Sequence, residues 1–307
     1  MKLLYSILLF FVTNFTIFSQ TAWTPYQRQL WVRPMFNYSQ YNSAFLGENR
    51  ATYDDKIIIR SGFLSLEYGI TDRITVDVTG GIGKLSSHRL LNRVGQVSPQ
   101  TPAKYGSLDT RYGIRFKITD EFLSKYSWMP TLTLRIGGIA RGDYDKNPQA
   151  LGDGASGGEI NLYFAKDFNF YGLGVFGDVG YRRRQSPVPD DVLTHGAVYY
   201  RFLESWLFTI GYRGQRGQSG YAFADPRTQP PYNLFEIPVA DWYTPIYVNT
   251  LRPAWGRKEN FSNGEISLGY TDSYGNFWNV FASHTFTGFN TAQLTTVGFL
   301  VNFPFYL

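Results

Sequence analysis

The last stretch of the chain, 292–307, alternates between apolar and other side chains up to the final residue. The apolar positions are spaced by two and are rich in aromatic rings: Val297, Phe299, Val301, Phe303, Phe305 and Leu307. A period of two indicates a β-strand with one apolar face. Soluble sheets rarely leave such a strand open at an edge, because it invites pairing with another chain. A closed membrane barrel has no open edge and turns its apolar face to lipid. This stretch therefore predicts the closing strand of a transmembrane β-barrel.

Similar alternation recurs along the whole chain. About twelve segments show it, most strictly 108–118, where Ile114, Phe116 and Ile118 alternate with Arg111, Arg115 and Lys117. Counted from the first segment, the odd connections are long and polar and the even ones are short, which is the asymmetry of outer-membrane barrels. We therefore predict an all-β fold: a transmembrane, antiparallel, up-and-down β-barrel of about twelve strands. A large soluble β-sandwich or propeller would alternate similarly but gives no reason for this parity.

The N-terminus predicts export. Lys2 precedes an apolar run, 3–18, and Ser19 and Gln20 lead into a polar stretch. This pattern is typical of a cleaved secretory signal peptide, here 1–20, and the run is short for a membrane-spanning helix. The mature barrel would then cover 21–307 and reside in the cell outer membrane of a Gram-negative bacterium. The aromatic C-terminal strand resembles the assembly signal of such barrels, which implies outer-membrane lipids and the barrel-assembly machinery as partners.

Composition sets further limits. Aromatic residues make up 18% of the chain, and there is no cysteine, which excludes disulfides and thiolate metal sites. The formal net charge of +5 is spread along the sequence, so it gives little support to nucleic-acid binding. The mean hydropathy of −0.24 fits a barrel, because polar residues facing the lumen offset those facing lipid.

The inward positions of the predicted strands carry charges that cannot face lipid at low cost. The lumen-lining candidates are Arg33, Glu67, Asp77, Asp109, Arg111, Arg115, Lys117, Arg135, Glu159, Asp178, Arg213 and Glu265. They are compatible with a water-filled pore that mildly favours anions. They are equally compatible with an interior plugged by Arg–carboxylate pairs, because a barrel of about twelve strands is narrow.

The longest break between predicted strands, about 215–259, combines six prolines with many aromatic residues. It is too long for a simple connection, and we expect it to be an extracellular loop. Its aromatic side chains suit apolar or sugar-like ligands at a pore mouth. The binding candidates are Tyr232, Phe235, Trp242, Tyr243 and Trp255. A folded cap or an adhesive surface is the alternative.

Enzymatic and metal sites are weakly indicated. Ser283 and His284 are adjacent in a predicted strand, so their side chains point to opposite faces and cannot form a nucleophile–base pair. His195 is expected to be a solvated rim residue. The run beginning at Asp143 starts like a calcium loop but lacks its later glycine and glutamate. We therefore predict no enzyme activity, no catalytic residue, no metal and no cofactor.

The stretch 66–76, LEYGITDRITV, resembles the strand–turn–strand opening of outer-membrane barrels of the phenol-degradation (meta-pathway) transporter-like family. The stretches around 152–162 and 180–202 resemble later strands of that group. The resemblance covers most of the mature chain, carries no catalytic residues, and implies a barrel that passes small, often hydrophobic compounds. The function expected is thus a porin-like channel or transporter for small hydrophobic or anionic solutes. The alternative is a non-conducting structural or adhesive barrel that acts through its extracellular loops.

Overall fold

The computed structural model describes residues 22–46, 49–87, 104–144, 155–168, 172–185, 188–218, 258–289 and 291–307. The predicted signal peptide and the five aromatic binding candidates of the long loop lie outside these ranges. None of the described residues forms a helix of the length and apolarity that crossing a membrane requires.

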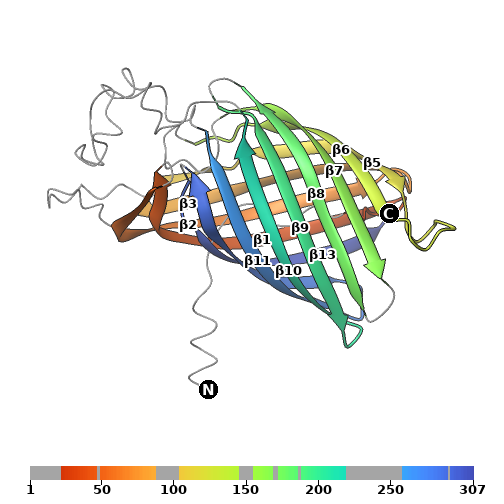
Figure 1. Ribbon diagram of the computed structural model, residues 1–307. Coiled ribbons are helices and arrows are strands. Elements are labelled where there is room, and N and C mark those ends of the chain that lie inside the picture. The colour runs from red at the N-terminus through yellow and green to blue at the C-terminus, as the bar shows by residue number, and fades with distance from the viewer. Residues whose placement is uncertain are drawn as a thin grey trace.

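The described chain forms one closed antiparallel barrel (Figure 1). Its elements are β1 (Gln29–Leu46), β2 (Asn49–Gly69), β3 (Ile74–Ser87), β4 (Lys104–Ser107), β5 (Thr110–Thr119), β6 (Thr131–Ala140), β7 (Gly157–Phe168), β8 (Leu173–Arg184), β9 (Asp191–Phe202), β10 (Trp206–Gly217), β11 (Asn260–Thr271), β12 (Phe277–Phe289) and β13 (Thr295–Tyr306). β13 pairs with β1 and β2 with β3, which closes the ring. β4 and β5 pair with successive parts of β3, so they are two halves of one strand. The predicted twelve-stranded barrel is confirmed.

Alternation along each strand separates the two faces of the wall. In β7, Ile160, Leu162 and Phe164 are exposed on the outer face, while Glu159 and Asn161 are buried on the inner face. The same division holds for most positions around the barrel, with large apolar side chains outside and charged or hydroxyl side chains inside, although Ile57, Phe281 and Leu300 are buried apolar side chains on the inner face. The outer face of a soluble sheet has to contact water, whereas an apolar outer belt of this kind contacts lipid. The wall is therefore built for a lipid bilayer.

The connections differ between the two ends of the barrel. Few residues separate β2 from β3, β7 from β8, β9 from β10 and β11 from β12, at the end that holds the C-terminus. The connections from β3 to β4, β6 to β7 and β10 to β11 are long and leave from the other end, which we take as extracellular. The link between β5 and β6, at 120–130, is an exception, because it lies at the end with short connections but is itself longer.

The first connection differs from the expectation. The polar segment up to about Asp55 is typical of a loop, yet β1 and β2 continue through it as a tall hairpin, paired up to Leu46 and Asn49. Paired backbone groups satisfy their hydrogen bonds between the two strands whatever the side chains are. The polar composition of this segment therefore marks a wall that rises toward solvent rather than a loop.

Indole rings gather at the periplasmic end. Trp206 is the first residue of β10, Trp278 is the second residue of β12, and Trp128 precedes β6. Trp278 donates a hydrogen bond from Nε1 to Asp272 in the adjoining turn at 3.1 Å. Aromatic rings with one polar atom favour the boundary between lipid and water. This ring of indoles therefore marks the periplasmic interface.

Candidate functional site: the polar lumen

The width of the barrel leaves room inside it. Twelve strands spaced by about 4.8 Å and tilted by about 40° give a wall roughly 24 Å across. Side chains that reach in by roughly 6 Å from each side leave about 12 Å. What fills this space therefore decides whether a solute can pass.

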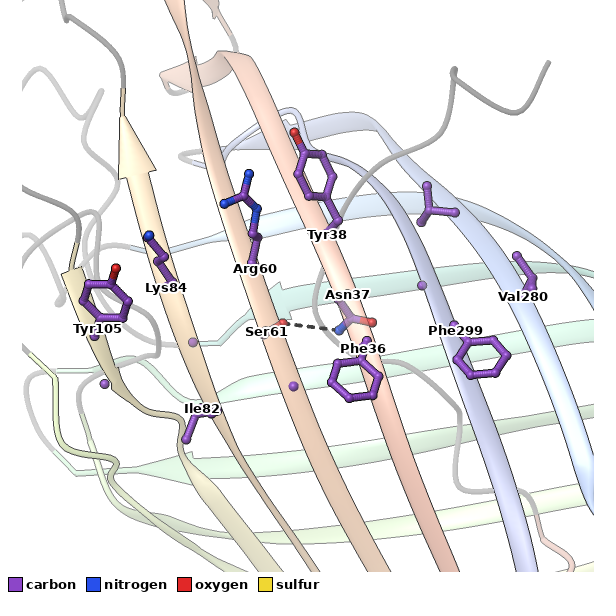
Figure 2. A pocket seen from close by; sticks show the side chains of 15 residues that line it. Phe36, Asn37, Tyr38, Arg60, Ser61, Ile82, Lys84, Tyr105, Val280 and Phe299 are labelled. Atoms are coloured by element: carbon purple, nitrogen blue, oxygen red, sulfur yellow. Dashed lines mark hydrogen bonds between the residues drawn. The ribbon is translucent and has the colours of Figure 1, made fainter. Parts of the chain in front are cut away.

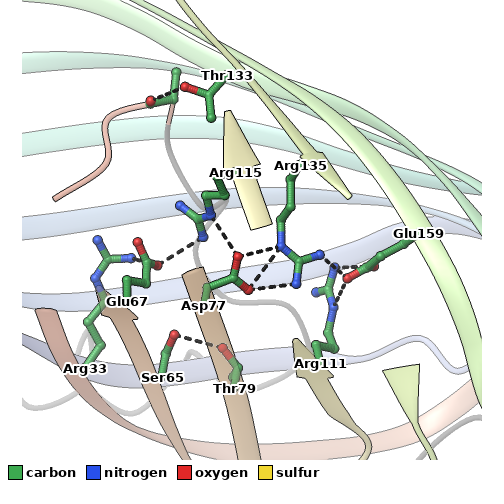
Figure 3. A network of polar contacts seen from close by, with 11 residues as sticks. Arg33, Ser65, Glu67, Asp77, Thr79, Arg111, Arg115, Thr133, Arg135 and Glu159 are labelled. Atoms are coloured by element: carbon green, nitrogen blue, oxygen red, sulfur yellow. Dashed lines mark hydrogen bonds and ion pairs between the residues drawn. The ribbon is translucent and has the colours of Figure 1, made fainter. Parts of the chain in front are cut away.

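One wall of the lumen carries a continuous series of ion pairs, which we call the charge ladder (Figure 3). Its members are Arg33, Glu67, Arg115, Asp77, Arg135, Glu159 and Arg111. At its first end, Arg33 on β1 contacts Glu67 on β2 at 2.7 Å and donates to Asn302 on β13 at 3.0 Å. Glu67 also accepts from Arg115 on β5 at 3.0 Å. The ladder thus begins across the seam where β13 closes on β1.

The middle of the ladder is centred on Asp77 of β3. Its carboxylate accepts from Nε of Arg115 at 3.2 Å, and from Nε and a terminal nitrogen of Arg135 at 3.0 and 2.7 Å. Arg135 reaches on to Glu159 of β7, which also binds Arg111 through both oxygens, at 2.9 and 2.6 Å. The Arg115 and Arg135 side chains are fully buried. Charges sealed from water in this way need their partners.

The opposite wall holds a second charged group, the histidine cluster, made of Asp178, His195, Arg213 and Glu265. His195 on β9 lies 2.6 Å from Glu265 on β11 and 3.6 Å from Asp178 on β8. Arg213 on β10 lies 3.9 Å from the same glutamate. The prediction that His195 is a solvated rim residue is wrong, because its side chain is buried between two carboxylates inside the wall.

The N-terminal segment, 22–26, enters the lumen near its periplasmic end. The Ala22 carbonyl accepts a hydrogen bond from Thr133 of β6 at 2.6 Å, and Ala22 is fully buried. Trp23 donates from Nε1 to Glu121 at 3.0 Å, and its ring lies 6.0 Å from Tyr199 in an edge contact. The segment therefore narrows the lumen at this end, where it contacts β6, one of the strands that carry the charge ladder.

The extracellular half of the lumen is apolar on one side. Ile57 and Ile59 of β2, Leu85 of β3, Leu108 and Tyr144 form a buried group facing inward. They lie further toward the extracellular ends of their strands than Glu67 and Asp77 do. A solute entering from outside would meet this apolar cluster before the charge ladder.

The remaining lumen candidates lie at the ends of the charged walls. Asp109 accepts hydrogen bonds from the Gly142 amide at 3.0 Å and from the Tyr144 hydroxyl. Lys117 contacts Asp120 at 3.0 Å. The structure thus gives all twelve candidates polar contacts inside the barrel and gathers seven of them in one ladder. The histidine cluster lies on the other wall, apart from the charge ladder.

Sequence reasoning missed several residues that shape the lumen. The apolar cluster was hidden because 57–59 borders the segment expected to be a loop, although three consecutive isoleucines were a signal of burial. The contact of Trp23 with Glu121 joins two segments outside the strands, and no local pattern indicates it. His284 was considered as an enzymatic base; its ring lies 2.7 Å from Thr295 on the outer face.

A closed antiparallel barrel with an apolar outer belt and a charged interior is an outer-membrane β-barrel, and this places the chain in the outer membrane. No family model matches the chain, and no curated protein matches it either.

Solved structures are similar to it. The COG4313 outer membrane channel from Pseudomonas putida F1 matches with a TM-score of 0.63 at 13% identity, covering 95% of this chain and 100% of that one. The KdgM porin matches with a TM-score of 0.43 at 8% identity, covering 88% of this chain and 99% of that one. The CymD monoaromatic hydrocarbon channel matches with a TM-score of 0.40 at 10% identity, covering 92% of this chain and 89% of that one. Of these three, the first supports the shared barrel architecture.

Proposed function

We propose that this chain is a narrow outer-membrane channel for small solutes and that it performs no catalysis. The observation that carries the proposal is the inward-facing polar wall of a closed barrel. Asn37, Asn263 and Asn279 place buried amide oxygens inside it that have no partner among the described residues. Buried polar atoms of this kind are normally satisfied by water. A hydrated lumen is the requirement that distinguishes a channel from a packed core.

The lumen suggests the chemistry of the solute. Its apolar cluster would hold a hydrocarbon body, and the ladder beyond it has four guanidinium groups against three carboxylates. A small hydrophobic compound, alone or with one negative charge, suits this order of surfaces. The resemblance to the phenol-degradation transporter-like family supports the same class of solute.

We also propose that the aromatic residues of the long loop bind the solute at the extracellular mouth. Trp242 and Trp255 are the residues to change. Their replacement by alanine should raise the concentration at which an aromatic carboxylate such as benzoate blocks the channel current. Unchanged block would assign solute binding to the lumen instead.

One observation favours the alternative, a non-conducting surface barrel. The central side chains of the charge ladder are sealed from solvent, and the N-terminal segment fills part of the remaining space. If both stay in place permanently, the barrel acts only through its extracellular loops.

Planar-bilayer recording separates the two functions. We expect the refolded mature chain to give small, discrete conductance steps. Trp23→Ala should enlarge them, because it removes the hydrogen bond to Glu121 and the edge contact with Tyr199 that hold the N-terminal segment. Trp278→Phe, on the lipid-facing side of the wall at the periplasmic interface, is the matched control and should leave the steps unchanged. Silence of both the wild-type chain and Trp23→Ala would refute a channel.

A further inference from the structure

The outer wall of the barrel carries two cations at a height where lipid headgroups begin. Arg60 on β2 and Lys84 on β3 are direct register partners and both point outward. Tyr38 on β1 pairs with Arg60, and Tyr105 on β4 pairs with Lys84. Figure 2 shows the four side chains in one row across four neighbouring strands.

The height of this row follows from the strands. Arg60 lies about nine residues from Gly69, the periplasmic end of β2. A tilted strand climbs by about 2.4 Å per residue, which puts Arg60 roughly 21 Å above that end. The apolar band of an outer-membrane barrel is about 25 Å tall. The row therefore lies at the outer-leaflet boundary, where its two tyrosines match an upper aromatic girdle.

Each cation is held against a ring. The Arg60 guanidinium carbon lies 5.5 Å from the centroid of Tyr38, and Lys84 Nζ lies 4.8 Å from the centroid of Tyr105. Neither cation forms an ion pair with any described carboxylate. The rings restrict both side chains while leaving their charges available, which lowers the entropy lost when an anion binds.

Directly below the cations the wall is hollowed. Gly62 lies in register between Phe36 and Ile82, two of the more exposed apolar side chains of the barrel, at 63% and 71%. The missing side chain leaves a depression between them that belongs to a larger hollow reaching Phe299 on β13. A hydrocarbon chain pointing into the membrane from Arg60 would lie in this depression.

We propose that Arg60, Lys84 and the depression over Gly62 form a binding site for a phosphate-bearing lipid of the outer leaflet. The two cations would bind the phosphate, because guanidinium and ammonium groups pair strongly with phosphate oxygens. The apolar depression would receive one acyl chain. The two cations lie at headgroup height and match a negatively charged headgroup, and the apolar groove on the membrane side matches an acyl chain. This combination favours an anionic lipid over a soluble anion or a protein segment.

Native mass spectrometry of the detergent-solubilised mature barrel, titrated with diphosphorylated lipid A, tests the proposal. R60Q/K84Q should weaken binding by roughly tenfold to thirtyfold, the effect expected for two cations at an anionic lipid surface. R183Q/R216Q is the matched control. It removes two exposed, outward cations from the extracellular halves of β8 and β10, which are separated by β9. We expect this control to bind within twofold of wild type.

Two further measurements divide the site into its parts. Dephosphorylated lipid A should bind the wild-type chain as weakly as diphosphorylated lipid A binds R60Q/K84Q. Gly62→Leu fills the depression and should weaken binding while both charges remain. All variants should keep the gel mobility of the folded barrel, since every change lies on the outer face. Equal affinity of wild type and R60Q/K84Q, or equal binding of both lipids, would overturn the proposal.

Discussion

Replacing Asp77 by asparagine removes one negative charge from the centre of the charge ladder. Asp77 accepts hydrogen bonds from Arg115 at 3.2 Å and from Arg135 at 2.7 to 3.1 Å, and neither guanidinium group has contact with solvent. Removing one partner of a buried ion pair typically costs about 3–5 kcal/mol. Asparagine keeps one acceptor oxygen and the same shape, so we expect the lower end, about 3 kcal/mol.

Asp167→Asn is the matched control. Asp167 contacts Arg201 at 3.1 Å, but the Arg201 side chain is 48% exposed, so water can solvate the charge left behind. Such a pair contributes at most about 1 kcal/mol. Urea unfolding of both variants, refolded in phosphatidylcholine vesicles, measures the two losses against wild type. Equal losses for Asp77→Asn and Asp167→Asn would refute the view that the ladder is sealed and mutually dependent.

Two other predictions concern the periplasmic end. A methyl group at Gly69 would meet the Tyr26 carbonyl oxygen at 2.0 Å, whereas one at Gly196 meets nothing within 4 Å. Gly69→Ala should therefore displace the N-terminal segment and enlarge the conductance steps, while Gly196→Ala should leave them unchanged. Conductance steps of equal size in the two variants would contradict this prediction. Desolvation opposes ionisation of Asp272, but hydrogen bonds from the turn and from Trp278 outweigh it and hold its pKa below the usual value. The contribution of ionised Asp272 to the stability of the barrel is therefore complete above about pH 4. It is lost as the pH falls through the lowered pKa of Asp272. Asp272→Ala should lower the urea midpoint at pH 7 but much less at pH 2, and an equal effect at both would exclude ionised Asp272 as the cause.

The wall of this protein was predictable from its sequence because it depends on a local rule. Side chains alternate across a strand, so Ile114 and Phe116 had to face away from Arg111 and Arg115 whichever strands were their neighbours. The cost of placing charge in lipid then fixed which face was inside. The strand count, the closed barrel and the position of the long loop between β10 and β11 followed from the same rule.

The contents of the lumen were less predictable because they depend on register. Parity places Asp77 inside but does not say that it meets Arg115 and Arg135 rather than water. His195 was misplaced for this reason, since Asp178 and Glu265, which surround it, lie on β8 and β11 and are far from it in sequence. The tall β1–β2 hairpin was missed because its polar residues resemble a loop, whereas backbone pairing continues between the two strands up to Leu46 and Asn49.

Cysteine accessibility tests the central claim, a hydrated path through the barrel, most directly. The chain has no cysteine, so single replacements report without background. Ser267 of β11 faces inward and is partly exposed, and its neighbour Leu268 faces lipid with an exposure of 43%. In a planar bilayer, a charged thiol reagent should reduce the conductance of Ser267→Cys and leave Leu268→Cys unchanged. A conducting Ser267→Cys barrel that the reagent never alters, in current or in mass, would contradict a hydrated path along the inner wall.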